Sequence, residues 1–460
     1  MAKSSSPANL PSSSLPPILR EMHALRQESV ARILLQGVFV GGCTGGVIGV
    51  FRWLYDHGCA WLVALLQHKT LSHEEILLLF AVLLLMALFQ GQLVRKVPLI
   101  SGSGIPQVEL SIMGKLPFPW LRIVTCKFIG TLVSLMGGLS VGREGPSIQM
   151  GAAVGCGFGS LFRKISGENP GHASRFLVAG SVAGMTAAFG APCAGMLFAF
   201  EEIKTLITIP HLLFTSAAAA SAWAVVTLVF GFGLVFPFAD IASLPWGQLW
   251  IAPLLGIMFG FFGAGYNLLL YGTTIFHDRQ KVVPPALKPI IPFFISGLLF
   301  FFYPQVLAGF GYSMPELGGL TGTHLAITSL AVLLGVKILF SVLSFASGVP
   351  GGILMPMLFI GGMAGALAGT TCAELMPSLT GRLPVFLVLG MTSLFAGTVR
   401  APLTGIALVA EMCGCFHCLP EMLLAAECAT IVANKTGSRP IYDALKYRTL
   451  KSERRARRKN

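Results

Sequence analysis

Long apolar runs without charged residues recur along this chain and limit its possible folds more than any other feature. Between Lys204 and Asp278 the only charged residue is Asp240. Charged residues make up 11% of the chain and hydrophobic residues 54%, whereas a soluble domain is about a quarter charged. Runs long enough to cross a bilayer lie at 77–94, 211–236, 250–271, 287–303 and 325–345. The sequence therefore predicts an all-α polytopic membrane protein.

Positive charge is concentrated at the two ends of the chain, whose formal net charge is +13. Residues 446–460 hold eight Lys or Arg and one Glu, and Arg20, Arg26 and Arg32 lie near the other end. The positive-inside tendency predicts that both termini are cytoplasmic, with the basic tail attracted to anionic lipid. No aromatic-interleaved or folded module accompanies the tail, so no nucleic-acid partner is expected.

The ten cysteines do not resemble a disulfide framework. Six lie in apolar segments and are interpreted as small core residues: Cys43, Cys126, Cys156, Cys193, Cys372 and Cys428. The compact stretch Cys413-Gly-Cys415-Phe-His417-Cys418 has a spacing that permits a metal site or a disulfide. It lacks a second ligand pair, so an ordinary loop with free thiols, on the outer side, is favoured. Ser- and Pro-rich residues 3–18 predict a disordered leader before an amphipathic stretch at 17–29.

An intramembrane carboxylate marks the candidate site. Residues 141–151 read Val-Gly-Arg-Glu-Gly-Pro-Ser-Ile-Gln-Met-Gly, which places Glu144 between Gly142 and Gly145. Glycine lets the backbone approach a ligand closely, and Pro146 fits the first turn of a helix. These residues predict a helix N-terminus whose free N–H groups bind an anion without a formal positive charge. Glu144 is then a tethered anion, and an intramembrane carboxyl is a functional candidate by default.

Residues 101–106, Ser-Gly-Ser-Gly-Ile-Pro, have a similar pattern, in which glycines are followed closely by a proline. Pro106 fits a first helical turn, and Ser103 could cap that helix or present its hydroxyl to a ligand. Alone, the pattern is typical of a plain capped turn, so it gains weight only from the motif at 141–151.

The second half of the chain repeats parts of the first. At a spacing of 206 residues, the matches pair Gly142, Gly145, Gly184 and Phe189 with Gly348, Gly351, Gly390 and Phe395. At a spacing of 210, they pair Ala191-Pro192, Gly195 and Glu201 with Ala401-Pro402, Gly405 and Glu411. A four-residue insertion would reconcile the two spacings. Two such repeats in a membrane protein form a site at their interface from broken helices, and the sequence leaves open whether they are parallel or inverted.

Three glycine motifs resemble the anion-site motifs of the CLC family of chloride channels and chloride/proton antiporters. They are Gly102-Ser103-Gly104-Ile105-Pro106, Gly142-Arg143-Glu144-Gly145-Pro146 and Gly351-Gly352-Ile353-Leu354-Met355-Pro356. Tyr442 matches the tyrosine of that family's last helix. The resemblance runs from about residue 30 to 450. It implies a homodimer with one pore per subunit and two inverted repeats of tilted, broken helices. The expected division is a cytoplasmic leader (1–29), two transmembrane repeats (30–235 and 236–445) and a basic cytoplasmic tail (446–460).

Carried over residue by residue, the resemblance implies a dehydrated chloride site near the midplane. The expected anion-binding residues, which act through hydroxyls or backbone N–H groups, are Ser103, Gly104, Ile105, Gly145, Ile353, Leu354 and Tyr442. Glu144 would be the gate and proton acceptor. Glu202 would match the inward-facing glutamate that distinguishes antiporters. Chloride is the transported ligand, and neither a metal nor another cofactor is implied.

The function implied by the resemblance is secondary active exchange of Cl⁻ for H⁺ in the cell (inner) membrane. The short form resembles prokaryotic members without a cytoplasmic regulatory domain. A passive voltage- or pH-gated chloride channel on the same scaffold is the alternative; Glu202 favours the antiporter, unless it is simply the polar end of a span before Lys204. Ser103 favours chloride over nitrate, and the glutamate motif lacks the changes of fluoride exporters. No HExxH, Walker loop or nucleophile elbow is present, so no enzyme is expected.

Charged residues beside the motifs have simpler interpretations. Glu201 is interpreted as structural, near the subunit interface. Arg143 is expected to pair with an acidic or carbonyl partner, because a naked cation in the pore would stall conduction. Lys127 and Lys337 lie at broadly corresponding places in apolar sequence, where they could snorkel or raise the local potential.

Overall fold

The computed structural model describes residues 29–66, 72–166, 173–204, 208–238, 241–280, 282–307 and 324–457. Within these segments the regular structure is helical, apart from two isolated β-bridges between glycine motifs. The predicted disordered leader and all but the last residue of the amphipathic stretch at 17–29 lie outside the described residues.

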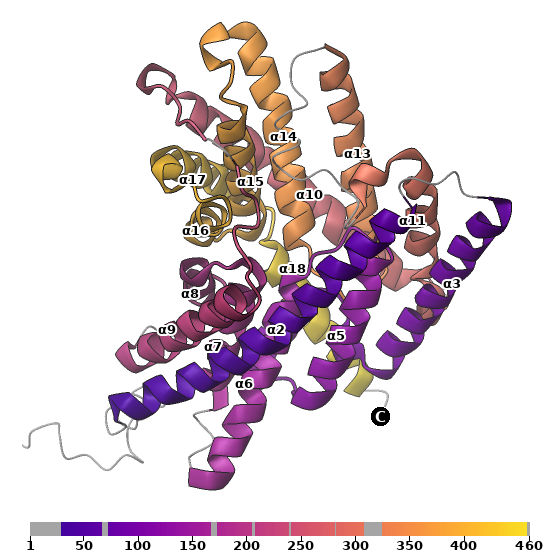
Figure 1. The fold of residues 1–460 in the computed structure, drawn as a ribbon, viewed down its shortest axis with the longest axis vertical. Helices are drawn as coiled ribbons and strands as arrows, with labels where there is room; N and C mark the ends of the chain where they lie inside the picture. The colour runs from indigo at the N-terminus through magenta and orange to yellow at the C-terminus, as the bar shows by residue number, and fades with distance from the viewer. Residues whose placement is uncertain are drawn as a thin grey trace, which may run out of the picture.

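The longer helices of the first half are α2 (Val30–Leu66), α3 (His73–Lys96), α4 (Ile105–Ile112), α5 (Trp120–Met136), α6 (Glu144–Ser166), α7 (Ala173–Phe189), α8 (Pro192–Glu201) and α9 (Ile209–Ala224). Those of the second half are α10 (Ile251–Arg279), α11 (Ile290–Phe302), α13 (His324–Ala346), α14 (Leu354–Leu375), α15 (Leu383–Val399), α16 (Pro402–Cys413), α17 (Leu419–Lys435) and α18 (Ile441–Arg457). In Figure 1, α8, α9, α16 and α17 lie at one edge of the molecule and α3, α11 and α13 at the other, with α18 between them.

Eight helical segments within the described ranges are long and apolar enough to cross a membrane. All five predicted spans fall among them. The span predicted at 211–236 is shorter than expected, because α9 passes into a π-turn at Val225–Val229 and the chain turns at Gly231 with a φ of 69°. Glycine adopts this left-handed conformation without steric cost, which makes it a common residue at the end of a helix.

The two halves of the chain are related by one constant offset. Helices α6, α7, α8 and α9 begin at residues 144, 173, 192 and 209, and α14, α15, α16 and α17 begin 210 residues later, at 354, 383, 402 and 419. Close glycine contacts follow the same offset. The backbone of Gly180 lies against Gly151 between α6 and α7, and that of Gly390 lies against Gly361 between α14 and α15, where a Cβ on Gly361 would be 2.6 Å from the Gly390 carbonyl oxygen.

The predicted spacing of 206 residues, and with it the four-residue insertion, is therefore wrong. Gly184 corresponds to position 394 rather than to Gly390, and Gly142 to Gly352 rather than to Gly348. The error is close to one helical turn of 3.6 residues. In helices rich in Gly and Ala, a match displaced by one turn places small residues on the same face, so the sequence pattern alone favours the wrong register.

Reciprocal capping by two glutamates shows that the repeats are inverted. The Glu201 carboxylate, at the end of α8, accepts hydrogen bonds of 2.7 and 3.2 Å from first-turn N–H groups of α16. The Glu411 carboxylate, near the end of α16, accepts bonds of 2.8 and 3.0 Å from first-turn N–H groups of α8. Each helix end meets the other helix's start, as antiparallel neighbours require. Anionic groups stabilise helix N-termini, and Glu201 has the structural role predicted for it.

Replacing Glu201 or Glu411 by Gln is expected to lower the stability of the protein. The change weakens three charge-assisted hydrogen bonds at Glu201 and two at Glu411, and hydrogen bonds to charged groups contribute about 1.5–3 kcal/mol. The fraction of monodisperse protein after heating in detergent measures the effect. Glu74→Gln, at an exposed position in the first turn of α3, is the control and should change little. Equal thermal stability of all three variants would contradict the capping role.

The cysteines differ in part from expectation. Cys43 and Cys193 are exposed on α2 and α8 rather than in the core, because they face outward from helices whose other sides carry the packing glycines and alanines. Cys413, Cys415 and Cys418 are buried. All ten cysteines lie in described segments and are free thiols. Among the described residues, no group of three His, Cys, Asp or Glu side chains is placed to hold a metal ion.

Candidate functional site

Backbone hydrogen bonds join the three glycine motifs at one place. Gly142 and Gly352 exchange two N–H to carbonyl bonds, each of 2.7 Å. Gly102 donates to the Val349 carbonyl and accepts from the Gly351 N–H, both at 3.1 Å. Since α4, α6 and α14 start directly after these segments, their N-termini are brought together. The unpaired N–H groups of a helix's first turn then come from three helices at once.

Glycine is required where the motifs meet. A Cβ added to Gly145 would lie 2.5 Å from the Ser103 hydroxyl oxygen and 2.8 Å from its carbonyl oxygen. A Cβ on Gly352 would lie 3.1 Å from the Gly145 nitrogen. Gly104 has a φ of 93°, and a side chain there would collide with Gln149. The predicted site residues Ser103 and Gly145 are thus in contact, and Gly104 is next to Ser103 in the chain. The glycines allow the backbones of the two motifs to approach each other closely.

Glu144 lies at this junction and is completely buried. It is the first residue of α6, and its Oε2 accepts a hydrogen bond of 3.3 Å from the Met355 N–H in the first turn of α14. Within the described residues, its Oε1 has no hydrogen-bond partner. The carboxylate of one helix therefore occupies the N-terminus of another, where the positive end of the helix dipole favours an anion. Met355 was not among the predicted site residues, because its N–H becomes a ligand only through the junction of the two repeats.

The predicted N–H donors lie at helix starts. Ile353 precedes α14 as its N-cap and Leu354 is its first residue, and both side chains are buried. Ile105 is the first residue of α4, and its N–H donates to the Ser103 hydroxyl oxygen at 3.4 Å. The N-cap of α4 is Gly104, without a side-chain cap bond. The Ser103 hydroxyl hydrogen therefore stays available for another acceptor.

Tyr442 supplies a second hydroxyl. It lies in the first turn of α18, is completely buried, and its hydroxyl has no hydrogen-bond partner within the described part of the chain. Tyr442 also lies within electrostatic range of both Glu144 and Glu202. A buried hydroxyl without a partner costs free energy, unless a ligand or water accepts a hydrogen bond from it.

Glu202 follows the last residue of α8 and is buried, with 5% of its surface exposed. Four charged side chains lie within electrostatic range of it: Glu109, Lys204, Asp443 and Lys446. We refer to these four as the inner charged cluster. Lys446 donates to the Glu109 carboxylate at 2.6 Å and to the Asp443 carboxylate at 2.7 Å, and Lys204 lies 3.4 Å from Asp443. Glu202 is thus set apart from Glu201, which binds the start of α16.

The charges of the inner charged cluster stabilise one another. Burial alone would raise the pKa of Asp443, but hydrogen bonds and charge from Lys446 and Lys204 hold this pKa below its ordinary value. Burial opposes the charge of Lys446, yet Asp443 and Glu109 raise its pKa to about 12. The stability contributed by Asp443 is therefore present above its unfolded pKa and lost as the pH falls through the lowered folded pKa.

The inner charged cluster could not be predicted from the sequence, because its members come from α4, the segment that follows α8, and α18. The one local signal is Glu109, a carboxylate within the apolar helix α4. Such a residue in a membrane protein needs a partner, but nothing in the sequence identifies Lys446 as that partner.

The other cationic side chains near the glycine motifs form an ion pair with a carboxylate or donate hydrogen bonds to backbone carbonyls. Arg143 pairs with Asp56 of α2 at 3.3 Å, which confirms the prediction that it has an acidic partner. Lys127 is completely buried and donates to the carbonyls of Ile100 and Gly102 at 2.8 and 2.6 Å, so it fixes the loop before Ser103. Lys337, at the offset of 210, donates to a carbonyl at 2.6 Å. Neither lysine snorkels.

Replacing Gly145 by Ala is expected to weaken the chloride binding that the sequence predicts for this junction about tenfold or more. The added methyl group must displace Ser103, and a forced shift of this kind in a packed site costs about 1–3 kcal/mol, of which 1.4 kcal/mol corresponds to tenfold. Titration calorimetry of purified protein with chloride measures the change. The control is Gly335→Ala in α13, where a Cβ would meet no atom within 4 Å. An unchanged chloride affinity in Gly145→Ala would contradict the assignment.

Comparisons with known proteins agree with the fold described above. Residues 86–434 match the family described as "Voltage gated chloride channel". The structure is similar to an X-ray crystal structure of a slow cyanobacterial Cl⁻/H⁺ antiporter, with a TM-score of 0.84 and 28% identity over 91% of this chain and 98% of that one. It is also similar to a eukaryotic CLC transporter (TM-score 0.74, 20% identity, 91% and 74% covered) and to a CLC-type fluoride/proton antiporter (0.67, 22%, 90% and 97%). These last two show likeness of fold alone.

Proposed function

We propose that this chain, which belongs to the voltage-gated chloride channel family, exchanges chloride for protons across a membrane. The observation that carries the proposal is the position of Glu144, a buried carboxylate at the N-terminus of α14 and beside the Ser103 loop. The similarity to a cyanobacterial Cl⁻/H⁺ antiporter supports exchange over passive conduction.

Chloride entering this site must be stabilised without being trapped. An anion that leaves water for hydrocarbon loses tens of kcal/mol of solvation. Helix N-termini replace part of that solvation with about half a positive charge each, and the hydroxyls of Ser103 and Tyr442 add donors. Partial charges of this size bind a permeant ion weakly enough to release it, whereas a buried lysine would hold chloride too firmly.

Exchange follows from competition between Glu144 and chloride. The ionised carboxylate takes the N–H groups that chloride needs. Protonation removes its charge and with it the attraction to those groups, so the side chain can leave and an anion can replace it. Proton binding and anion binding are then coupled, and by linkage the coupling is reciprocal.

Glu202 is proposed as the inner proton donor to Glu144. It lies beside the inner charged cluster, and Tyr442 is within electrostatic range of both glutamates. Glu109 and Asp443 both form ion pairs with Lys446, which stabilise the charged form of these two carboxylates. Glu202 makes no ion pair within the part of the chain that the structure describes, so its carboxyl is the group in this region that is left to exchange protons.

A passive chloride channel is the second candidate. Reconstitution in liposomes, with a pH electrode and a chloride electrode, distinguishes the two functions. A chloride gradient should drive protons against their gradient through an antiporter, and the reversal potential should shift when a pH gradient is imposed. A reversal potential that follows chloride alone would identify a channel.

The assembly and orientation proposed here are a homodimer in the cell membrane with both termini cytoplasmic. Family resemblance supports the dimer. The basic residues of α18 and the tail support the orientation through the positive-inside tendency. Cross-linking in liposomes and labelling of cysteines added at the termini would test both.

A further inference from the structure

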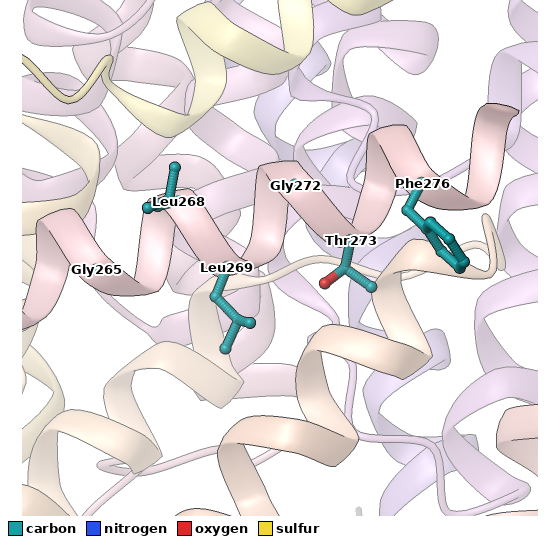
Figure 2. A pocket seen from close by; sticks show the side chains of 6 residues that line it. All are labelled: Gly265, Leu268, Leu269, Gly272, Thr273 and Phe276. Atoms are coloured by element: carbon teal, nitrogen blue, oxygen red, sulfur yellow. The ribbon is translucent and has the colours of Figure 1, made fainter.

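An apolar groove lies along α10, on a face outside the proposed ion path. It is lined by Gly265, Leu268, Leu269, Gly272, Thr273 and Phe276 and has a volume of about 450 Å³. Figure 2 shows the side chains of Leu269, Thr273 and Phe276 on one side of the helix and that of Leu268 on the other, with Gly272 between them and Gly265 at one end. Leu268 and Phe276 are 75% and 69% exposed. We call this feature the α10 groove.

Two glycines create the groove, and neither is explained by packing or backbone geometry. A Cβ at Gly265 or Gly272 would meet no atom within 4 Å, and neither residue has a positive φ. Elsewhere in α10 glycines allow close packing: a side chain at Gly256 would collide with the Ala425 carbonyl of α17. Glycine within a helix destabilises it relative to alanine. Gly265 and Gly272 therefore serve to leave an open space on this face of α10.

The groove has the length of one lipid leaflet. Residues 265 to 276 span about 16 Å of helix at 1.5 Å per residue. A bilayer's hydrocarbon core is about 30 Å thick, so the length of the groove along the helix axis equals about half of that thickness. The helix that carries it, within the segment Trp246–Arg279, is long and apolar enough to cross a membrane.

Arg279, the last residue of α10, lies at the end of the groove. Positions 265, 269, 272, 276 and 279 are three or four residues apart and so share one helix face, which ends in Arg279. Arg279 is exposed and makes no ion pair or side-chain hydrogen bond among the described residues. Its neighbours are engaged: Arg448 of α18 binds Asp278 at 2.6 and 2.8 Å, and Lys288 donates to the His277 carbonyl.

We infer that the α10 groove binds an acyl chain of an anionic phospholipid, with the lipid phosphate at Arg279. The charge of Arg279 complements an anionic headgroup at the membrane surface, where each basic residue adds about 1 kcal/mol of attraction. The adjoining basic helix α18 places this end of α10 in the cytoplasmic leaflet, which carries the anionic lipid. A zwitterionic lipid offers the same acyl chain but no net negative charge to Arg279.

Native mass spectrometry of the full-length protein, incubated with phosphatidylglycerol or phosphatidylcholine of equal chain length, tests the inference. We expect about a fivefold preference for phosphatidylglycerol, the effect of one basic residue near an anionic headgroup. Arg279→Gln should lose this preference and Arg279→Lys should keep it. Arg95→Gln, at an exposed position in the last turn of α3, is the matched control and should behave as the unmodified protein.

Variants that fill the α10 groove provide a second test of the inference. Gly272→Leu should reduce retention of both lipids, whereas Gly335→Leu, at a similarly open position in α13, should not. Equal retention of the two lipids by the unmodified protein would overturn the proposal, as would a preference that survives Arg279→Gln. Because the readout is lipid retention, the result does not depend on whether the protein is an antiporter.

Discussion

Replacing Glu144 by Gln is expected to abolish proton transport while leaving chloride flux in place. Glutamine has nearly the shape of a protonated glutamate, but it carries no charge and takes up no proton. It therefore cannot compete as an anion for the N–H groups at the start of α14, where Glu144 now accepts a bond of 3.3 Å from Met355. Chloride should pass without a proton in exchange.

Liposomes loaded with chloride measure both fluxes, and proton movement should fall at least about a hundredfold, the lower range for loss of a proton-transfer group. Glu411→Gln is the matched control. Glu411 is also a carboxylate that accepts bonds from first-turn N–H groups, those of α8, but it lies outside the junction of the glycine motifs. Proton pumping that survives Glu144→Gln would contradict the role of Glu144, and loss of pumping in Glu411→Gln would show that any capping carboxylate has this effect.

The second large effect is expected for Glu202→Gln. This variant should also stop proton transport and conduct chloride, because Glu144 remains but has no proton supply from the inner side. The change is made at a buried position beside the inner charged cluster, and within the described part of the chain the Glu202 carboxyl accepts no hydrogen bond from the first-turn N–H groups of α4 or α14. Chloride affinity should therefore stay the same, unlike that of Gly145→Ala.

The adjacent glutamate makes a close control for Glu202. Glu201→Gln removes the same charge one residue earlier, but Glu201 binds the N-terminus of α16. We expect it to lower thermal stability and to keep proton coupling. The same liposome assay, together with chloride calorimetry, separates the outcomes. Coupled exchange in Glu202→Gln would remove the main sequence argument for an antiporter over a channel.

The membrane class and the start of the helix that carries the candidate site could both be predicted from the sequence, because they depend on local chemistry. Uncharged apolar runs predicted the spans, because their length against the bilayer does not depend on the rest of the fold. Gly-Arg-Glu-Gly-Pro at 142–146 predicted the start of α6, since Pro and Gly act on their own backbone and that of their neighbours. The resemblance of three motifs predicted the family, which the comparisons confirm.

The contacts across the repeats could be assigned only from the packed helices. The tertiary structure set the offset at 210 residues, chose Asp56 as the partner of Arg143 and Lys446 as that of Glu109, and brought the Met355 N–H to Glu144. These contacts depend on how helices distant in the chain pack, and small residues recur each turn, so several registers fit one sequence pattern. The physical reason is that a helix start is encoded by adjacent residues, whereas a contact between helices is fixed only when all their surfaces are packed together.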